Sequence, residues 1–167
     1  MKSSERPVID LPYTSQEWAL EVIALGGLAL IIGMLSLAWF DLPALVPTHF
    51  GPSGRADAWG DKRSILILPV MSVILYLMLT VTNRYPHKFN YLWPITAQNA
   101  REQYRLARLL LAWLKAEVII LFTFLEWMTI RVALGQAAGL GSIFLPIVLG
   151  VIFGTVGIYF YFAYMKR

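Results

Sequence analysis

The chain has 167 residues, of which 58% are hydrophobic and only 14% are charged, with a formal net charge of +4. Soluble domains typically carry about 25% charged residues, so this composition excludes an ordinary soluble domain and indicates a membrane protein. The lack of cysteine excludes disulfides, thiolate metal sites and cysteine nucleophiles. The basic balance needs no nucleic-acid partner, because membrane proteins carry excess Lys and Arg on the cytoplasmic side.

The hydrophobic residues gather in four blocks, each close to the roughly 20 residues that cross about 30 Å of hydrocarbon. We therefore expect an all-α integral membrane bundle of four transmembrane helices, with residues 1–167 forming a single transmembrane domain. The first block is too long for a signal peptide, so we interpret it as an uncleaved anchor. The predicted spans are residues 18–40, 64–82, 109–130 and 142–164.

Lys and Arg residues are distributed unevenly between the two ends of these spans. Nine lie before the first span, between the second and third, or at the end of the chain, and four lie in the other two connections. The nine are Lys2, Arg6, Arg84, Lys88, Arg101, Arg105, Arg108, Lys166 and Arg167, and the four are Arg55, Lys62, Arg63 and Arg131. The positive-inside rule then predicts a plasma membrane protein with both termini and the link 83–108 in the cytoplasm and the loop 41–63 outside.

The segment 1–17 and the start of the first span carry prolines and mixed charges. Pro7 and Pro12 break any helix in this segment, which we interpret either as a tail along the membrane surface or as a disordered end. Glu21 lies one turn inside the first span, which begins at Trp18. We expect its carboxylate to reach the lipid headgroups.

The outer loop is rich in Pro, Gly, Asp and Ser, so it is expected to be structured by turns. His49 and Asp57 are its chemical candidates, because an imidazole and a carboxylate can exchange a proton or ligate a divalent metal. Zinc needs three or four ligands, and only Asp41 and Asp61 lie nearby, so we predict no metal and no cofactor. Two other interpretations remain open: the pair stabilises a tight turn, or the loop recognises an extracellular peptide, lipid or wall component.

The third span is preceded by a basic helix. Thr96 or Asn99 is expected to cap it. Arg101, Arg105 and Arg108 recur at helical spacing and predict a basic cytoplasmic face that continues into the span. That face would orient the protein and contact anionic lipids or a cytoplasmic partner.

Lys115 and Glu117 lie inside the third span, where an unpaired charge costs roughly 2.5 kcal/mol or more. They point about 200° apart and cannot pair with each other. We expect Lys115 to extend toward the cytoplasm. Glu117 is expected to face the bundle interior, either protonated or paired with another helix, with Tyr76 as a candidate partner. Glu126 is expected to form a solvated pair with Arg131 at the outer interface.

The fourth span carries Gly150, Gly154 and Gly157 on one stripe. Small residues at this spacing let two helix backbones approach closely. The stripe predicts a packing face, either within the bundle or against another copy.

The order of residues in the outer loop resembles a bacterial membrane domain of unknown function 1648, related to the first half of the SdpI-type toxin immunity protein family. The resemblance continues into the central segment of the chain. Two features differ from the family. Gly51 in the outer loop stands where many relatives have Asn or Asp, and the sequence ends before the second membrane domain of the immunity protein. The loop residues are Leu42, Pro43, Val46, Pro47, His49, Phe50, Gly54, Asp57 and Lys62, and the central ones are Phe89, Asn90, Tyr91, Ile95, Thr96, Asn99, Tyr104, Arg105, Arg108, Leu114 and Lys115.

Three classes of function remain open, and none is enzymatic, because the sequence places no nucleophile beside a base. The first is a small multi-pass protein that senses, binds or confers resistance to an extracellular agent, as the resemblance implies. The second is an accessory subunit of a larger membrane complex, and the third is a subunit of an oligomeric transporter or channel. The expected partners are the lipid bilayer and other membrane subunits or a second copy, with no nucleic acid.

Overall fold

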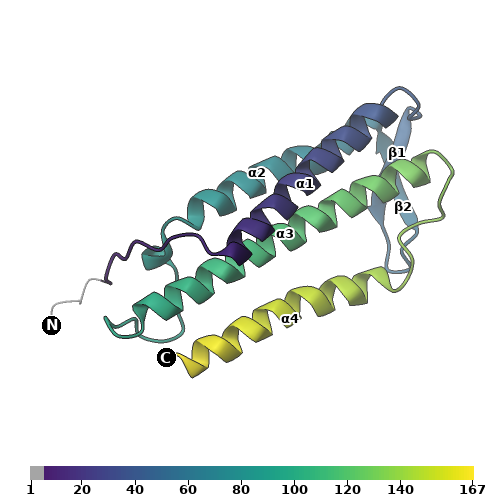
Figure 1. Cartoon of the computed structure of the whole chain (residues 1–167). Helices are drawn as coiled ribbons and strands as arrows, with labels where there is room; N and C mark the ends of the chain where they lie inside the picture. Colours follow the sequence, from purple (N-terminus) through teal and green to yellow (C-terminus); the bar gives the residue numbers. More distant parts are fainter. Residues whose placement is uncertain (1–5) are drawn as a thin grey trace.

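The computed structural model describes residues 6–167, which form four long helices and a β-hairpin (Figure 1). The helices are α1 (Ser15–Ala38), α2 (Ile67–Thr82), α3 (Ala100–Ala133) and α4 (Phe144–Met165). The hairpin strands are β1 (Leu45–Phe50) and β2 (Ala56–Asp61), and the short 3-10 helices are η1 (Lys62–Leu66) and η2 (Pro86–Lys88).

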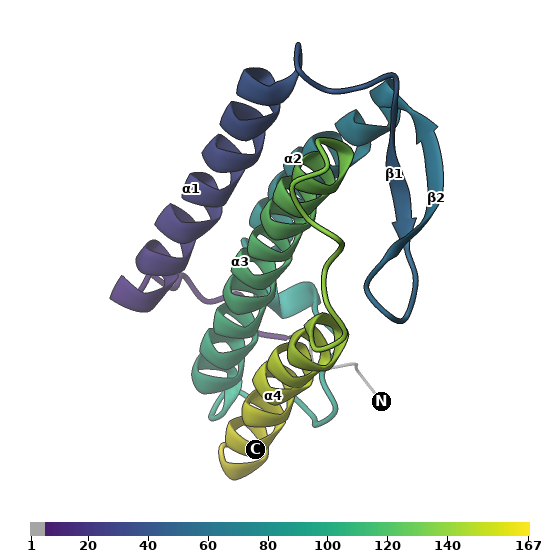
Figure 2. The same ribbon diagram turned by 90° about the vertical axis from the view of Figure 1, so that its right-hand side faces the viewer.

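Helix α3 is the centre of the bundle. It packs against α1, α2 and α4, whereas α1 and α2 also contact each other, and α4 rests mainly on α3 (Figure 2). The hairpin lies at one end of the bundle, and the C-terminal end of α4 and the residues leading into α1 lie at the other (Figure 1). The hairpin and the two ends of the described chain therefore occupy opposite poles.

Three helical segments within residues 6–167 are long and apolar enough to cross a membrane: Ser15–Ala38, Lys62–Thr82 and Phe144–Met165. They correspond to three of the four predicted spans and indicate a membrane location. Their outward faces are apolar; Leu77, Phe153 and Ile158 are each more than half exposed. Helix α3 is also long enough, but Lys115, Glu117 and Glu126 interrupt its apolar part, so the fourth span stays a prediction.

The all-α prediction missed the hairpin. Strands β1 and β2 pair antiparallel from Leu45 opposite Asp61 to Phe50 opposite Ala56, with irregular register around His49. Pro47 lies within β1, which is an edge strand where a missing backbone donor is tolerated. Val46 is fully buried with Leu35, Leu42, Ile65 and Ile130, so a small core anchors the hairpin to the bundle.

Helix α1 begins at Ser15, three residues before the predicted start. Thr14 caps it: the Thr14 hydroxyl accepts from the Glu17 amide at 3.2 Å, and the Glu17 carboxylate accepts from the Thr14 amide at 2.8 Å. This reciprocal pair is a capping box, which satisfies two backbone donors at the helix start.

The residues before α1 pack against the protein. Leu11 is buried with Ala100 and Tyr104, and the Arg6 guanidinium donates to the Phe89 carbonyl. Burial also raises the pKa of Tyr91, whose ring lies beside that of Tyr104. A disordered end is therefore wrong for residues 6–14, the tail along the membrane surface stays a prediction, and residues 1–5 lie outside the described chain.

Candidate functional site

The hairpin brings His49 and Asp57 together. The His49 Nδ1 lies 2.5 Å from an Asp57 carboxylate oxygen, and the two side chains are 67% and 51% exposed. This contact fixes the imidazole ring and leaves its other nitrogen free to meet a molecule in solution. A Cβ on Gly51 would lie 2.7 Å from the Asp57 carboxylate, so a larger residue at position 51 would shift the end of the Asp57 side chain.

The tip of the hairpin docks on the loop between α3 and α4. The Gly54 carbonyl accepts from the Leu140 amide at 2.7 Å, and the Gly54 amide donates to the Gly51 carbonyl at 2.8 Å. Gly54 has a φ of 77°, which favours glycine, and a Cβ there would lie 2.5 Å from the Gly141 carbonyl oxygen. Gly54 is therefore required for both the turn and the docking.

Lys62 holds the base of the hairpin. Its ammonium donates to the Leu42 carbonyl at 3.2 Å and lies 4.7 Å from the centre of the Trp39 ring. Of the remaining predicted loop residues, Pro47 is buried, Phe50 is half-buried and Pro43 is exposed. The hairpin is thus fixed at its base and its tip, with the His49 and Asp57 pair exposed between them.

Arg108 does not share the solvent-exposed basic face predicted for it. Only 5% exposed, it forms an ion pair with Glu17 at 2.8 Å and donates to the Leu11 carbonyl at 2.6 Å. Arg101 and Arg105 lie on the same helix face but are exposed. Arg108 differs from them because Glu17 of α1 and the Leu11 carbonyl contact it.

Lys115 is buried in the bundle, so the prediction that it extends toward the cytoplasm is wrong. Only 2% exposed, it pairs with Glu21 of α1 and donates to the Thr80 hydroxyl of α2 at 2.9 Å. The Tyr76 hydroxyl also donates to Glu21. Glu21 therefore faces the bundle rather than the headgroups, and Tyr76 partners Glu21 rather than Glu117.

Glu117 faces α4. One carboxylate oxygen accepts from the Thr155 hydroxyl, and the other is buried without a hydrogen-bond partner among residues 6–167. A polar partner on another helix was predicted, but it comes from the fourth helix instead of the second. The rotation of about 200° between Lys115 and Glu117 explains why they contact opposite sides of the bundle.

Glu126 forms no solvated pair with Arg131. Its side chain is fully buried, and neither carboxylate oxygen has a hydrogen-bond partner within the described part of the chain. Arg131 instead lies over the Trp127 ring and donates to the Gln136 carbonyl at 3.2 Å. Glu126 lies seven residues, nearly two turns, from buried Ile119, which places it on the inner face of α3.

The predicted glycine stripe of α4 is open in a single chain. A Cβ added at Gly150, Gly154 or Gly157 would meet nothing within 4 Å. Close backbone approach occurs at Gly27 instead, where a Cβ would lie 2.7 Å from an Ile119 methyl and where the Thr123 hydroxyl donates to the Gly27 carbonyl at 3.1 Å.

Three important positions were missed from the sequence. Glu17, Thr80 and Gly27 all contact α3. Signals were present, because the motif Thr14 to Glu17 has capping-box spacing and Gly26-Gly27 interrupts the first apolar block.

Among residues 6–167, no group of three or more His, Asp or Glu side chains gathers as a metal site would require. His49 and Asp57 are therefore a two-residue pair within the described chain.

The hairpin belongs to a segment of the chain that matches a family of known proteins. Residues 25–73, which run from α1 through the hairpin into α2, match the family described as domain of unknown function DUF1648. The chain is also similar to an uncharacterized protein of the archaeon Archaeoglobus fulgidus, with 36% identity over 87 residues, 47% of this chain and 48% of that protein. It thus spans about half the length of that relative. No solved structure matches significantly.

Proposed function

We propose that the chain is a four-span plasma membrane protein with both termini in the cytoplasm and the hairpin outside the cell. The unequal distribution of Lys and Arg supports this orientation. The opposite positions of the hairpin and the chain ends are compatible with it, because an even number of spans returns the chain to its starting side (Figure 1).

The fourth span in this proposal is the part of α3 at residues 109–130. A charge in mid-membrane costs roughly 2.5 to 3.5 kcal/mol unless it is paired or neutral. The pairing of Lys115 with Glu21 and the hydrogen bond from Thr155 to Glu117 reduce that cost. Paired charges on α3 support a helix that spans the bilayer while contacting three neighbours.

The function we propose is non-enzymatic binding of an extracellular agent by the hairpin. The observation that carries it is the exposed His49 and Asp57 pair on a strand pair fixed at both ends. A fixed loop loses little entropy on binding, which favours recognition. The resemblance of the loop sequence to the immunity protein family supports sensing of, or resistance to, such an agent as the role.

A photo-crosslinking amino acid tests this proposal in intact cells. Placed at exposed Thr48 beside the pair, it should crosslink to a molecule of the cell exterior. The crosslink should be lost in His49→Ala. The matched control at exposed Glu102 should not give this product. A Thr48 product that persists in His49→Ala, or that contains only cytoplasmic molecules, would contradict the proposal.

A second candidate is a subunit of a membrane complex or of an oligomer, and the open glycine stripe favours it. A helix with an uncovered stripe can accept a second helix at close distance. Cysteine at Gly154 should then crosslink to another polypeptide or a second copy, whereas cysteine at exposed Leu77 on α2 should not. Equal crosslinking at both positions would contradict this candidate.

A further inference from the structure

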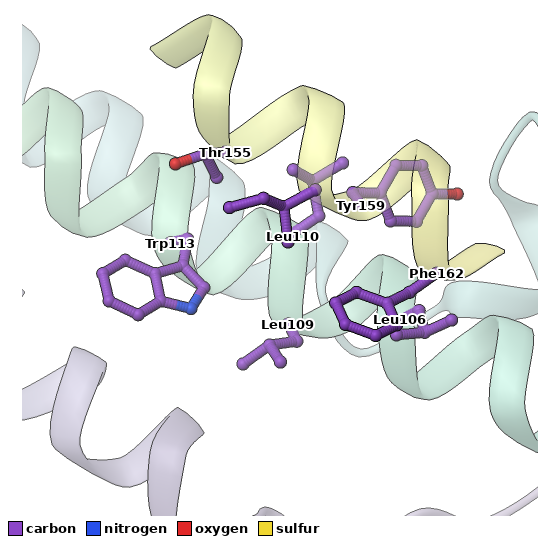
Figure 3. A pocket seen from close by; sticks show the side chains of 8 residues that line it. Leu106, Leu109, Leu110, Trp113, Thr155, Tyr159 and Phe162 are labelled. Carbon is purple, nitrogen blue, oxygen red and sulfur yellow. The ribbon is translucent and has the colours of Figure 1, made fainter. Parts of the chain in front are cut away.

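Two adjoining hollows lie between α3 and α4. The smaller, with a volume of about 310 Å³, includes Trp113 and Thr155 among its lining residues (Figure 3). The larger, about 510 Å³, is lined by Trp113 and Glu117 and extends along both helices to Phe124 and Phe144. Trp113 lines both hollows, and the hydrogen bond from Thr155 to Glu117 marks their meeting point.

The carboxylate in this groove lacks a basic partner. Glu17 pairs with Arg108 and Glu21 pairs with Lys115, so two other carboxylates of the bundle are neutralised by side chains. Glu117 receives only the neutral Thr155 hydroxyl, and its second oxygen is buried without a partner among the described residues. A carboxylate in apolar surroundings is stabilised by a proton or by a cation that reaches it.

The rest of the larger hollow is suited to an apolar cation. Phe124 and Phe144 stack with their ring centres 5.3 Å apart, and Trp113 adds a third aromatic surface beside Glu117. Aromatic faces attract cations, and burial strengthens this attraction. The volume lies within the roughly 300 to 1,000 Å³ of ordinary small-molecule sites.

The groove opens sideways because α4 rests mainly on α3. Ile147 and Val151, which line the larger hollow, are about half exposed. If α3 and α4 cross the bilayer as proposed above, this opening faces lipid. A ligand would then enter from the membrane, which selects molecules that partition into lipid.

We propose that this groove binds a lipophilic organic cation, meaning a protonated amine with an aromatic or branched apolar body. The ammonium pairs with the Glu117 carboxylate, and the body fills the larger hollow against Trp113 and Phe124. Charge complementarity favours this ligand over a lipid acyl chain, which would leave the carboxylate oxygen without a partner. The inference uses the proposed spans but does not depend on the hairpin.

Binding of 3,3-diphenylpropylamine to the full chain in lipid nanodiscs tests this proposal by calorimetry. The matched neutral probe is 3,3-diphenylpropan-1-ol, which has the same body without the charge. We expect saturable binding of about one amine per chain, with the alcohol at least tenfold weaker. Glu117→Gln should weaken amine binding at least tenfold and leave alcohol binding unchanged.

Two further variants keep the test decisive. Glu126→Gln changes another buried carboxylate, which lines neither hollow, and should bind the amine as wild type does. Val151→Trp fills the larger hollow and should weaken amine binding even if Glu117→Gln fails to fold.

Equal binding of amine and alcohol would identify the groove as an acyl-chain site and overturn the proposal. Amine binding retained in Glu117→Gln would also overturn it. Neither result would bear on the function proposed for the hairpin. Amine binding in nanodiscs depends neither on which side of the membrane the hairpin faces nor on whether the hairpin binds a ligand.

Discussion

The two sides of α3 differ in the partners that they provide for its buried charged residues. On the side of α1 and α2, Lys115 meets a carboxylate and a hydroxyl from two helices, and nearer the start of α3 Arg108 meets Glu17. On the side of α4, Glu117 meets a single hydroxyl and an open groove. Both buried basic groups on the first side are paired, whereas the Glu117 carboxylate on the second side has one oxygen without a partner among the described residues.

This difference divides the bundle into two parts, which we call the scaffold and the attachment. Helices α1, α2 and α3 form the scaffold, in which the small residue Gly27 lets α1 approach α3 closely. Helix α4 forms the attachment, in which a Cβ added at Gly154 would meet nothing within 4 Å. Substitutions on the scaffold side should therefore reduce stability, and those on the attachment side should mainly alter binding or association.

The largest effect is expected from Lys115→Met. It leaves the largely buried Glu21 with Tyr76 as its remaining partner among the described residues, and removing one member of a buried pair typically costs about 3 to 5 kcal/mol. Unfolding in detergent, followed by circular dichroism, measures the change. The double variant with Glu21→Gln should recover most of the loss, and a Lys115→Met protein as stable as wild type would refute the closed scaffold.

A smaller effect is expected from Gly27→Val. Its new side chain meets the branched Ile119 side chain, which has little freedom to move, and overpacking costs about 1 to 3 kcal/mol. The same detergent unfolding assay measures it. Gly154→Val is the matched control and should leave the stability of the single chain nearly unchanged; equal losses in both variants would remove the distinction between the two sides.

Thr14→Ala should cost about 1 kcal/mol, because it removes the capping hydroxyl at the start of α1. Hydrogen exchange of the first-turn amides of α1 measures this local loss. Thr14→Ser should retain protection, since serine caps a helix as well. Unchanged exchange in Thr14→Ala would show that the Glu17 pair with Arg108 fixes this end without the cap.

The smallest effect is expected from Gln103→Met. The Gln103 amide donates to the Ala163 carbonyl at 2.8 Å, and hydrogen bonds between membrane helices average about 0.6 kcal/mol. Hydrogen exchange near Ala163 should rise while exchange in α1 stays unchanged. A rise in both helices would mean that α4 belongs to the scaffold.

The sequence was sufficient to predict the membrane character and the approximate extent of the helices. Apolar blocks of about 20 residues have few alternatives in a bilayer. The continuous helix from the basic segment into the third predicted span was also predictable, because Arg101, Arg105 and Arg108 keep helical spacing. The match over residues 25–73 confirms the resemblance to the domain of unknown function for the hairpin and its flanks.

The partners of the buried charges were not predictable in the same way. Spacing shows which face of a helix a residue occupies. Lys115 meets Glu21, however, because of how α1 and α3 are aligned along their axes. The hairpin was missed because Pro47 and the glycines near it are poor strand formers in isolation. Burial of Val46 against the bundle outweighs that local preference.

The central claim is that α3 crosses the membrane, so that the loop between α3 and α4 and the basic end of α3 lie on opposite sides. The chain lacks cysteine, so single cysteines at exposed Ala138 and exposed Arg101 can be labelled separately. In intact cells an impermeant maleimide should label Ala138→Cys, and it should label Arg101→Cys only after the membrane is opened. Labelling of both positions from the same side would contradict the account.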